Sequence, residues 1–162
     1  MSFRRDIVNL LLSQTPITEI VDDRVSDIFY SFEDVMNSDG NSFKFPAISV
    51  SQSATSTEHT LEAKQINLKR EQLQITVYQQ ITPQRFRSRQ ATVRAKEDLK
   101  ITEMDSLTDA VEASLNDFTG EAGEFLIRNT KIIDIRDEEF SNEKNRKTLA
   151  HQILIDFTIT KK

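Results

Sequence analysis

The sequence has no cysteine and no tryptophan, and only three glycines and three prolines among its 162 residues. The lack of cysteine excludes disulfide frameworks, thiolate zinc sites, cysteine nucleophiles and iron–sulfur clusters. The scarcity of glycine and proline excludes collagen-like, linker-like and low-complexity chains. None of the three glycines stands in a spacing that forms a phosphate-binding loop, so nucleotide binding through those motifs is excluded as well.

Long hydrophobic runs are also missing. No stretch approaches the roughly 18 apolar residues of a membrane-spanning helix. The first residues, MSFRRD, are polar and charged and do not resemble the apolar part of a Sec signal peptide. We therefore expect a soluble protein that is made in the cytoplasm and has no membrane partner. Its length predicts a single domain, residues 1–162, because compact domains cluster at about 100 to 150 residues.

Histidine, the most common general base, occurs only twice. His59 lies beside Glu58 in a stretch rich in serine and threonine, which favours an exposed loop histidine over a metal ligand. His151 lies on the apolar face of an expected strand, which favours a hydrogen-bonded core or interface histidine. The acidic run at 137–139 is interpreted as a solvated loop. No catalytic constellation is visible, so we expect no enzyme, no catalytic residues, no cofactor and no metal.

The net charge of −5 conceals four blocks of alternating sign. Residues 1–63 have 4 basic and 10 acidic side chains, and residues 64–100 have 9 basic and 3 acidic ones. Residues 101–143 have 3 basic and 12 acidic side chains, and residues 144–162 have 5 and 1. Blocks of this kind can place a basic and an acidic face on one molecule, as head-to-tail association of identical subunits requires. The alternative is that each block is a solvated face without a partner.

The basic segment 85–100 contains the candidate subunit-interface residues, which share a positive charge and lie close together in the sequence: Arg85, Arg87, Arg89, Arg94 and Lys96. We expect them to face an acidic segment of a neighbouring subunit. With Phe86 among them, they are also compatible with a small nucleic-acid or partner-binding module that contacts phosphates and stacks on a base. The acidic isoelectric point of about 5.1 weakens that second reading.

Hydrophobic periodicity predicts most of the secondary structure. Apolar residues at helical spacing predict amphipathic helices that begin at Ser2, at Thr15 with Pro16 in its first turn, and at Ser106, the last ending at Gly120. Alternation of apolar and polar residues predicts strands over 45–53, 72–78, 125–136 and 149–160. Residues 25–41 are expected to hold a short strand or extended loop, and 137–147 a charged connection. The basic segment 85–100 is interpreted as helical, although Phe86, Val93 and Leu99 are too sparse to define an apolar stripe.

Strands that occur in pairs around a helix predict an α+β domain, in which an antiparallel sheet of about four strands has helices packed on one face. Residues 54–65, rich in serine, threonine and glutamate, are expected to form a mobile hairpin arm or a loop. Long strands with unpaired edges favour the addition of a strand from a neighbouring subunit.

In order along the chain, these elements resemble the tail terminator and tail completion (head–tail joining) proteins of long-tailed bacteriophages. The resemblance rests on the segments FRRDIVNLLL, TPITEIVDDRV, FPAISVS, QLQITVYQQ, SLTDAVEASLNDF and LAHQILIDFTIT, which together span most of the chain. The long basic stretch at 85–100 and the turn near Gly40 depart from the family pattern.

The resemblance implies a structural virion protein that is not an enzyme. Such proteins form a ring, commonly a hexamer, at the head-proximal end of the tail, where the ring ends tail tube polymerisation and joins the tail to the neck. The implied partners are further copies of the chain, the tail tube protein and the neck or head completion protein. The implied location is the virion, with DNA passing through the lumen without specific binding.

Overall fold

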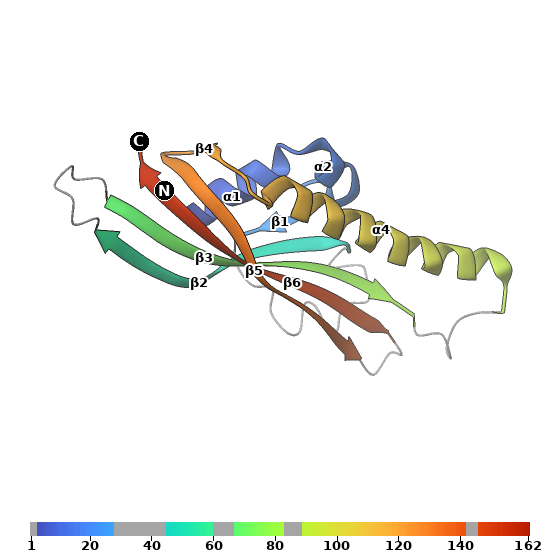
Figure 1. Cartoon of the computed structure of the whole chain (residues 1–162). Coiled ribbons are helices and arrows are strands. Elements are labelled where there is room, and N and C mark those ends of the chain that lie inside the picture. The colour runs from blue at the N-terminus through green and yellow to red at the C-terminus, as the bar shows by residue number, and fades with distance from the viewer. Residues whose placement is uncertain (1–2, 28–44, 60–66, 83–88, 142–145) are drawn as a thin grey trace.

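The computed structural model describes residues 3–27, 45–59, 67–82, 89–141 and 146–162. These form three helices: α1 (Phe3–Leu12), α2 (Thr15–Val21) and α4 (Ala91–Leu115). They also form six strands: β1 (Val25–Ser26), β2 (Ala47–His59), β3 (Asn67–Ile81), β4 (Gly120–Ala122), β5 (Phe125–Ser141) and β6 (Lys147–Lys161). Figure 1 shows the helices above a sheet of long strands.

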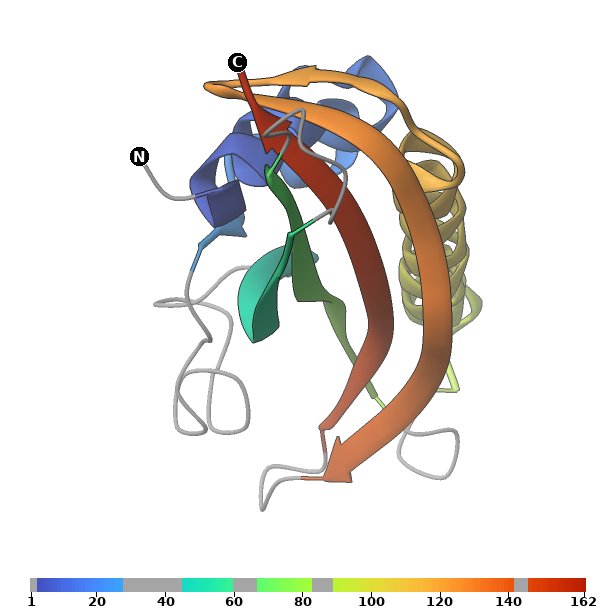
Figure 2. The same cartoon turned by 60° about the vertical axis from the view of Figure 1, so that its left-hand side comes forward.

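The six strands form one mixed sheet in the order β1-β2-β3-β6-β5-β4. β1 pairs parallel to β2, whereas every other pair of neighbouring strands in this order is antiparallel. The long strands curl into a half-barrel, and Figure 2 shows the bend of β5 and β6. Register shifts at 52/54 in β2 and at 127/129 and 132/134 in β5 add local bends to the twist of these strands.

The predicted fold class, an antiparallel sheet of about four strands with helices packed on one face, is therefore wrong. The sheet has six strands, includes a parallel pair and is curled. The two extra strands, β1 and β4, contain two and three residues, too few for a visible alternation. The parallel pairing of β1 arises because the chain runs from α2 alongside the start of β2, where Val25 lies opposite Ile48.

One core joins the helices to alternate residues of the long strands. Opposite pairs such as Val50 with Ile75, and Ile75 with Ile153, lie in adjacent strands with their side chains fully buried. The helices contribute equally buried side chains, which are Ile7, Leu11, Ile17, Val21, Leu107, Val111 and Leu115. Burial of a branched side chain of this size stabilises the fold by about 1.5 to 3 kcal/mol.

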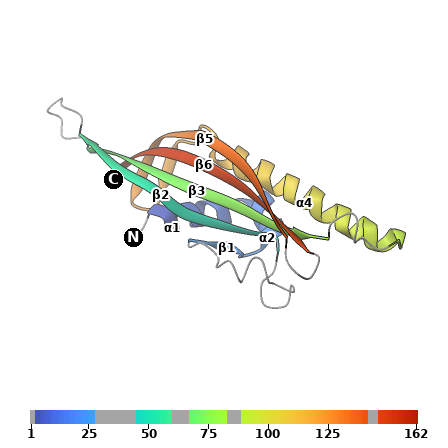
Figure 3. The same ribbon diagram turned by 90° about the horizontal axis from the view of Figure 1, so that it is seen from below.

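The helix predicted to begin at Ser106 begins instead at Ala91, so most of the predicted basic segment is helical. It ends at Leu115, five residues before Gly120, because Asn116 is already extended. Figure 3 shows the first half of α4 reaching past the end of the sheet. Two contacts fasten its middle to β3: the Glu97 carboxylate accepts from the Thr82 amide at 3.0 Å, and the Gln79 side chain donates to the Lys100 carbonyl at 3.2 Å.

Other predictions can be compared segment by segment. Of the residues 25–41, Val25 and Ser26 form β1, and residues 28–41 lie outside the described residues. Of the predicted arm 54–65, residues 54–59 continue β2 and pair with β3, and residues 60–65 lie outside the described residues. The acidic run 137–139 belongs to β5, not to a loop, because its backbone pairs with residues 149–151 of β6. In the described part of the chain, no helix is both long and apolar enough to cross a membrane.

Candidate functional site

The structure places only part of the predicted subunit interface. Arg85 and Arg87 lie outside the described residues. Arg89 precedes α4, and Arg94 and Lys96 lie in its first two turns, where all three are exposed. Of these three, Lys96 lines the groove described next.

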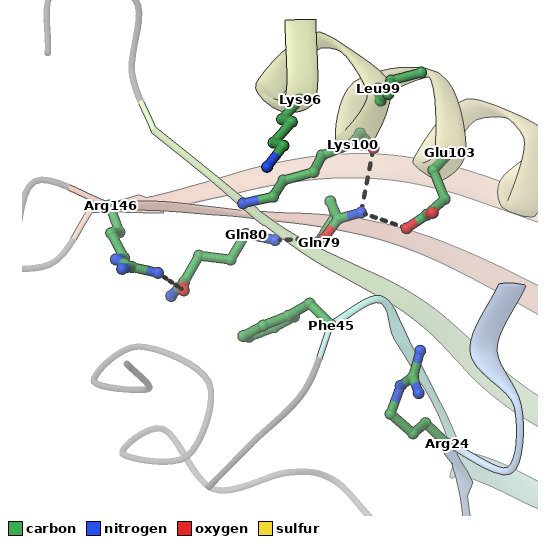
Figure 4. A pocket seen from close by; sticks show the side chains of 9 residues that line it. All are labelled: Arg24, Phe45, Gln79, Gln80, Lys96, Leu99, Lys100, Glu103 and Arg146. Carbon is green, nitrogen blue, oxygen red and sulfur yellow. Dashed lines mark hydrogen bonds between the residues drawn. The ribbon is translucent and has the colours of Figure 1, made fainter. Parts of the chain in front are cut away.

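This groove, which we call the cationic groove, has a volume of about 460 Å³. It lies between the first half of α4, the end of β3 and the start of β6 (Figure 4). Its lining contains four positively charged side chains, namely Arg24, Lys96, Lys100 and Arg146. Among the described residues of the lining, Glu103 is the one carboxylate, and the others are Phe45, Gln79, Gln80 and Leu99. The groove therefore has an excess of positive charge.

Hydrogen bonds hold two of the arginines in place. The Arg24 guanidinium donates to the carbonyl of Pro46 at 2.9 Å and to that of Ile20 at 3.1 Å. The Arg146 guanidinium donates to the Gln80 side-chain oxygen at 3.4 Å. Because these side chains are already ordered, a ligand that contacts them loses less conformational entropy on binding.

Two buried amides form the polar floor between the strands and α4. Gln79 is 2% exposed, and its side-chain nitrogen donates to both the Lys100 carbonyl and the Glu103 carboxylate at 3.2 Å. Its oxygen accepts from the Gln80 backbone amide at 3.1 Å. Figure 4 shows these bonds as dashed lines between β3 and the helix. The floor therefore fixes the distance between α4 and the sheet, and with it the width of the groove.

His151 lies outside the groove and joins three elements. From β6, its Nδ1 lies 2.6 Å from Asp137 of β5 and its Nε2 lies 2.9 Å from Glu112 of α4. Burial alone lowers the pKa of His151, but the hydrogen bonds and negative charges of the two carboxylates outweigh it and raise the pKa above its usual value. The prediction of a hydrogen-bonded histidine on the apolar face of this strand is confirmed.

His151 links the strands β5 and β6 to α4, because each ring nitrogen is hydrogen-bonded to a carboxylate. Among the described residues, no serine or threonine hydroxyl is hydrogen-bonded to the ring, as a nucleophile activated by this histidine would be. Within that same part of the chain, no three histidine, aspartate or glutamate residues gather in a way that could hold a metal ion. The side chain of His59, the second candidate ligand, lies outside the described side chains.

Sequence reasoning missed Arg24, Arg146 and the two glutamines of the groove, since each comes from a different segment of the chain. The local signal for the glutamines is the pair Gln79-Gln80 at the end of a strand, where alternation requires one of two neighbouring side chains to point inward. No local signal marks Arg24 or Arg146 as neighbours.

No protein-family model matches the sequence, and comparison with curated proteins gave no match. Comparison with solved structures gave a match along almost the whole chain. It covers 97% of this chain and 93% of a chain described as "Virion of native gene transfer agent (GTA) particle", with a TM-score of 0.55 and 8% sequence identity. Over its full length, the chain therefore shares its fold with a protein of a gene transfer agent virion.

Proposed function

We propose that this chain is a structural virion protein that forms a ring, hexameric by the resemblance noted above, at the head-proximal end of a phage tail. In this role it ends tail tube polymerisation and joins the tail to the head. The observation that supports the proposal is the full-length fold match to a gene transfer agent virion chain. Because the match leaves almost no part of either chain unaligned, it concerns a whole subunit and not a common substructure.

The proposed partners are further copies of the chain, the tail tube protein and the neck or head completion protein. DNA passes through the lumen without specific binding, and the protein resides in the virion. The proposal includes no enzymatic activity. The uneven distribution of charge along the chain supports self-association. Residues 64–100, with 9 basic and 3 acidic side chains, are followed directly by residues 101–143, with 3 basic and 12 acidic ones.

The mass of the purified protein in solution tests the proposal. Light scattering across a range of concentrations, with negative-stain images of any oligomer, should give a ring of about six copies, or a monomer that becomes a ring when tail tubes are added. Tubes assembled with the protein should stop growing. A strict monomer that leaves the length of assembling tubes unchanged would overturn the proposal.

The second candidate function is nucleic-acid binding through the basic segment 85–100. The exposed cations Arg89, Arg94 and Lys96, at and near the projecting start of α4, favour it. Binding of this kind depends steeply on salt, because cations released from phosphates drive it. A monomer that binds duplex DNA at low salt and loses it between about 50 and 200 mM would support this candidate over the ring.

A further inference from the structure

The charges of α4, the longest described helix, change in balance along its length. Four basic residues lie at or near its start, which are Arg89, Arg94, Lys96 and Lys100, with Glu97 and Asp98 among them. From there to Arg128 the chain has no lysine or arginine but seven acidic residues, which are Glu103, Asp105, Asp109, Glu112, Asp117, Glu121 and Glu124. The first four of these seven lie within α4, so this helix of 25 residues has a net positive start and a purely acidic second part.

This order of charges opposes the helix dipole. Negative side chains stabilise the start of a helix and positive ones its end, by about 0.3 to 1 kcal/mol each near the surface. The first turn of α4 has no acidic residue, and its last turn has no basic one. The charges of α4 are thus not arranged for the stability of the isolated helix, which favours a role in contacts with another molecule.

Both parts of α4 are accessible. Every residue from Ala91 to Lys96 is exposed, and this half of α4 projects past the ends of the strands (Figures 1 and 3). In the acidic half, Asp105 and Asp109 are exposed and lie four residues apart, so they share one face of the helix. We call this face the acidic stripe.

The chemistry of the cationic groove fits an acidic protein surface better than a phosphate backbone. Leu99, at its rim, is 65% exposed, and Phe45 is half-buried in its lining. An apolar rim contributes to binding when it meets apolar side chains, which a protein partner supplies. The neighbouring acidic stripe would repel a long polyanion such as DNA that continued from the groove along the same helix.

We propose that the cationic groove of one copy binds the acidic stripe of α4 from a neighbouring copy. This contact deepens the proposed function, because it rests on association of the chain with itself. The groove and the stripe are different surfaces of the same chain, so the contact is head-to-tail and leaves one groove and one stripe open on every pair. Contacts of this type close into rings when the rotation between neighbours permits it.

Reciprocal charge reversal tests the contact. The groove variant is Lys96→Glu with Lys100→Glu, and the stripe variant is Asp105→Lys with Asp109→Lys. All four side chains are exposed or half-buried. The substitution of Lys100 breaks its 3.3 Å ion pair with Glu97, but a surface pair of this kind contributes little to the free energy of unfolding. A control variant, Glu19→Lys with Lys131→Glu, changes exposed charges on α2 and β5 in the same way.

Each reversed variant should associate about tenfold more weakly than the unchanged protein in light scattering, because like charges then face each other across the contact. The variant that combines all four changes should associate nearly as well as the unchanged protein. A mixture of the two reversed variants should associate more tightly than either reversed variant alone. The control should associate normally. Circular dichroism confirms that each variant is folded.

The outcomes separate this contact from the proposed function. If the unchanged protein forms a ring and both reversed variants form it equally well, or if the folded combined variant remains a monomer, the contact is wrong and the ring stands. If the unchanged protein neither associates nor binds tail tubes, both are wrong. If instead it binds duplex DNA and only the groove variant loses that binding, the groove is a phosphate site and the contact is again wrong.

Discussion

His151 is a single side chain that connects α4, β5 and β6. When its ring is protonated, both nitrogens donate to carboxylates, on Asp137 and Glu112. The raised pKa means that the folded protein binds this proton more tightly than the unfolded chain does. The resulting stabilisation is fully present below pH about 6.5, the usual pKa of histidine, and is lost as the pH rises through the raised pKa of the folded state.

We therefore predict that His151→Gln lowers the free energy of unfolding more at pH about 6 than at pH about 8. The expected loss at the lower pH is on the order of 2 kcal/mol, typical of hydrogen bonds to charged groups. Urea unfolding at both values measures it. An equal loss at both pH values would contradict the prediction.

Gly123 occupies the turn between β4 and β5 with a φ of +58°, a conformation that side chains other than glycine rarely adopt. A Cβ atom there would also overlap the Asp6 carboxylate of α1, which is almost fully buried. Burial raises the pKa of Asp6, and the nearby charge of Glu124 adds to the effect. The glycine thus lets the turn pack directly against the first turn of α1.

Gly123→Ala should lower the free energy of unfolding by about 1 to 3 kcal/mol, since both strain and overlap act at this position. Thermal unfolding followed by circular dichroism provides the measurement. Adding Asp6→Ala removes the carboxylate that the new methyl group meets, so the double variant should lose less than the sum of the two single variants. Strict additivity would show that the overlap with Asp6 contributes nothing.

At the scale of elements, α4 differs most from its sequence-based prediction. Ser106 was predicted to begin the helix, but it lies in the interior of a helix that begins at Ala91. A helix that begins at Ser106 and a helix that continues through Ser106 predict opposite changes in the free energy of unfolding when this serine is replaced by alanine. Serine at a helix start stabilises it, whereas exposed serine inside a helix is less favourable than alanine.

Ser106→Ala should therefore raise the free energy of unfolding, by about 0.5 kcal/mol. Chemical denaturation detects a change of this size when the unchanged protein is measured in parallel. A decrease of about 1 kcal/mol would instead identify Ser106 as a helix cap and contradict a continuous α4. Thr102→Ala, at another exposed position of the same helix, serves as a matched interior substitution and should also be stabilising.

The predicted elements were most accurate where apolar and polar residues alternate in the sequence. Alternation located β3 and β6 because residues such as Leu73, Ile75 and Val77 belong to the apolar core and the residues between them are polar, even where these are also buried, as Thr76 is. The start of α4 had only a sparse signal, since residues 91–96 are all exposed and Val93 and Leu99 do not form a continuous apolar stripe. The groove was unpredictable for another reason: Arg24 and Arg146 become neighbours only through the pairing of distant strands.

At the scale of the whole molecule, one main core couples the three described helices to the curled sheet, and a smaller cluster around Tyr78 and Ala150 lies apart from it. Phe157 of β6 is fully buried, and its ring meets Phe3 of α1 edge to face with centroids 5.2 Å apart. The Phe3 ring makes a second contact of this kind with Phe125 of β5, at 5.6 Å. The first helix and the last strand are thus packed against each other in the same cluster.

A core of this kind predicts one cooperative unfolding transition, in which helices and sheet are lost together. Phe157→Ala should lower the free energy of unfolding by about 3 to 5 kcal/mol, because it removes a large buried ring and leaves a cavity between α1 and β6. Phe157→Leu keeps most of the volume and should cost distinctly less. Hydrogen exchange of the Phe157→Ala variant should show protection falling in α1 and α4 as much as in β6. If exchange accelerated in α1 alone, the helix would be a separate unit docked on the sheet, and the single core would be contradicted.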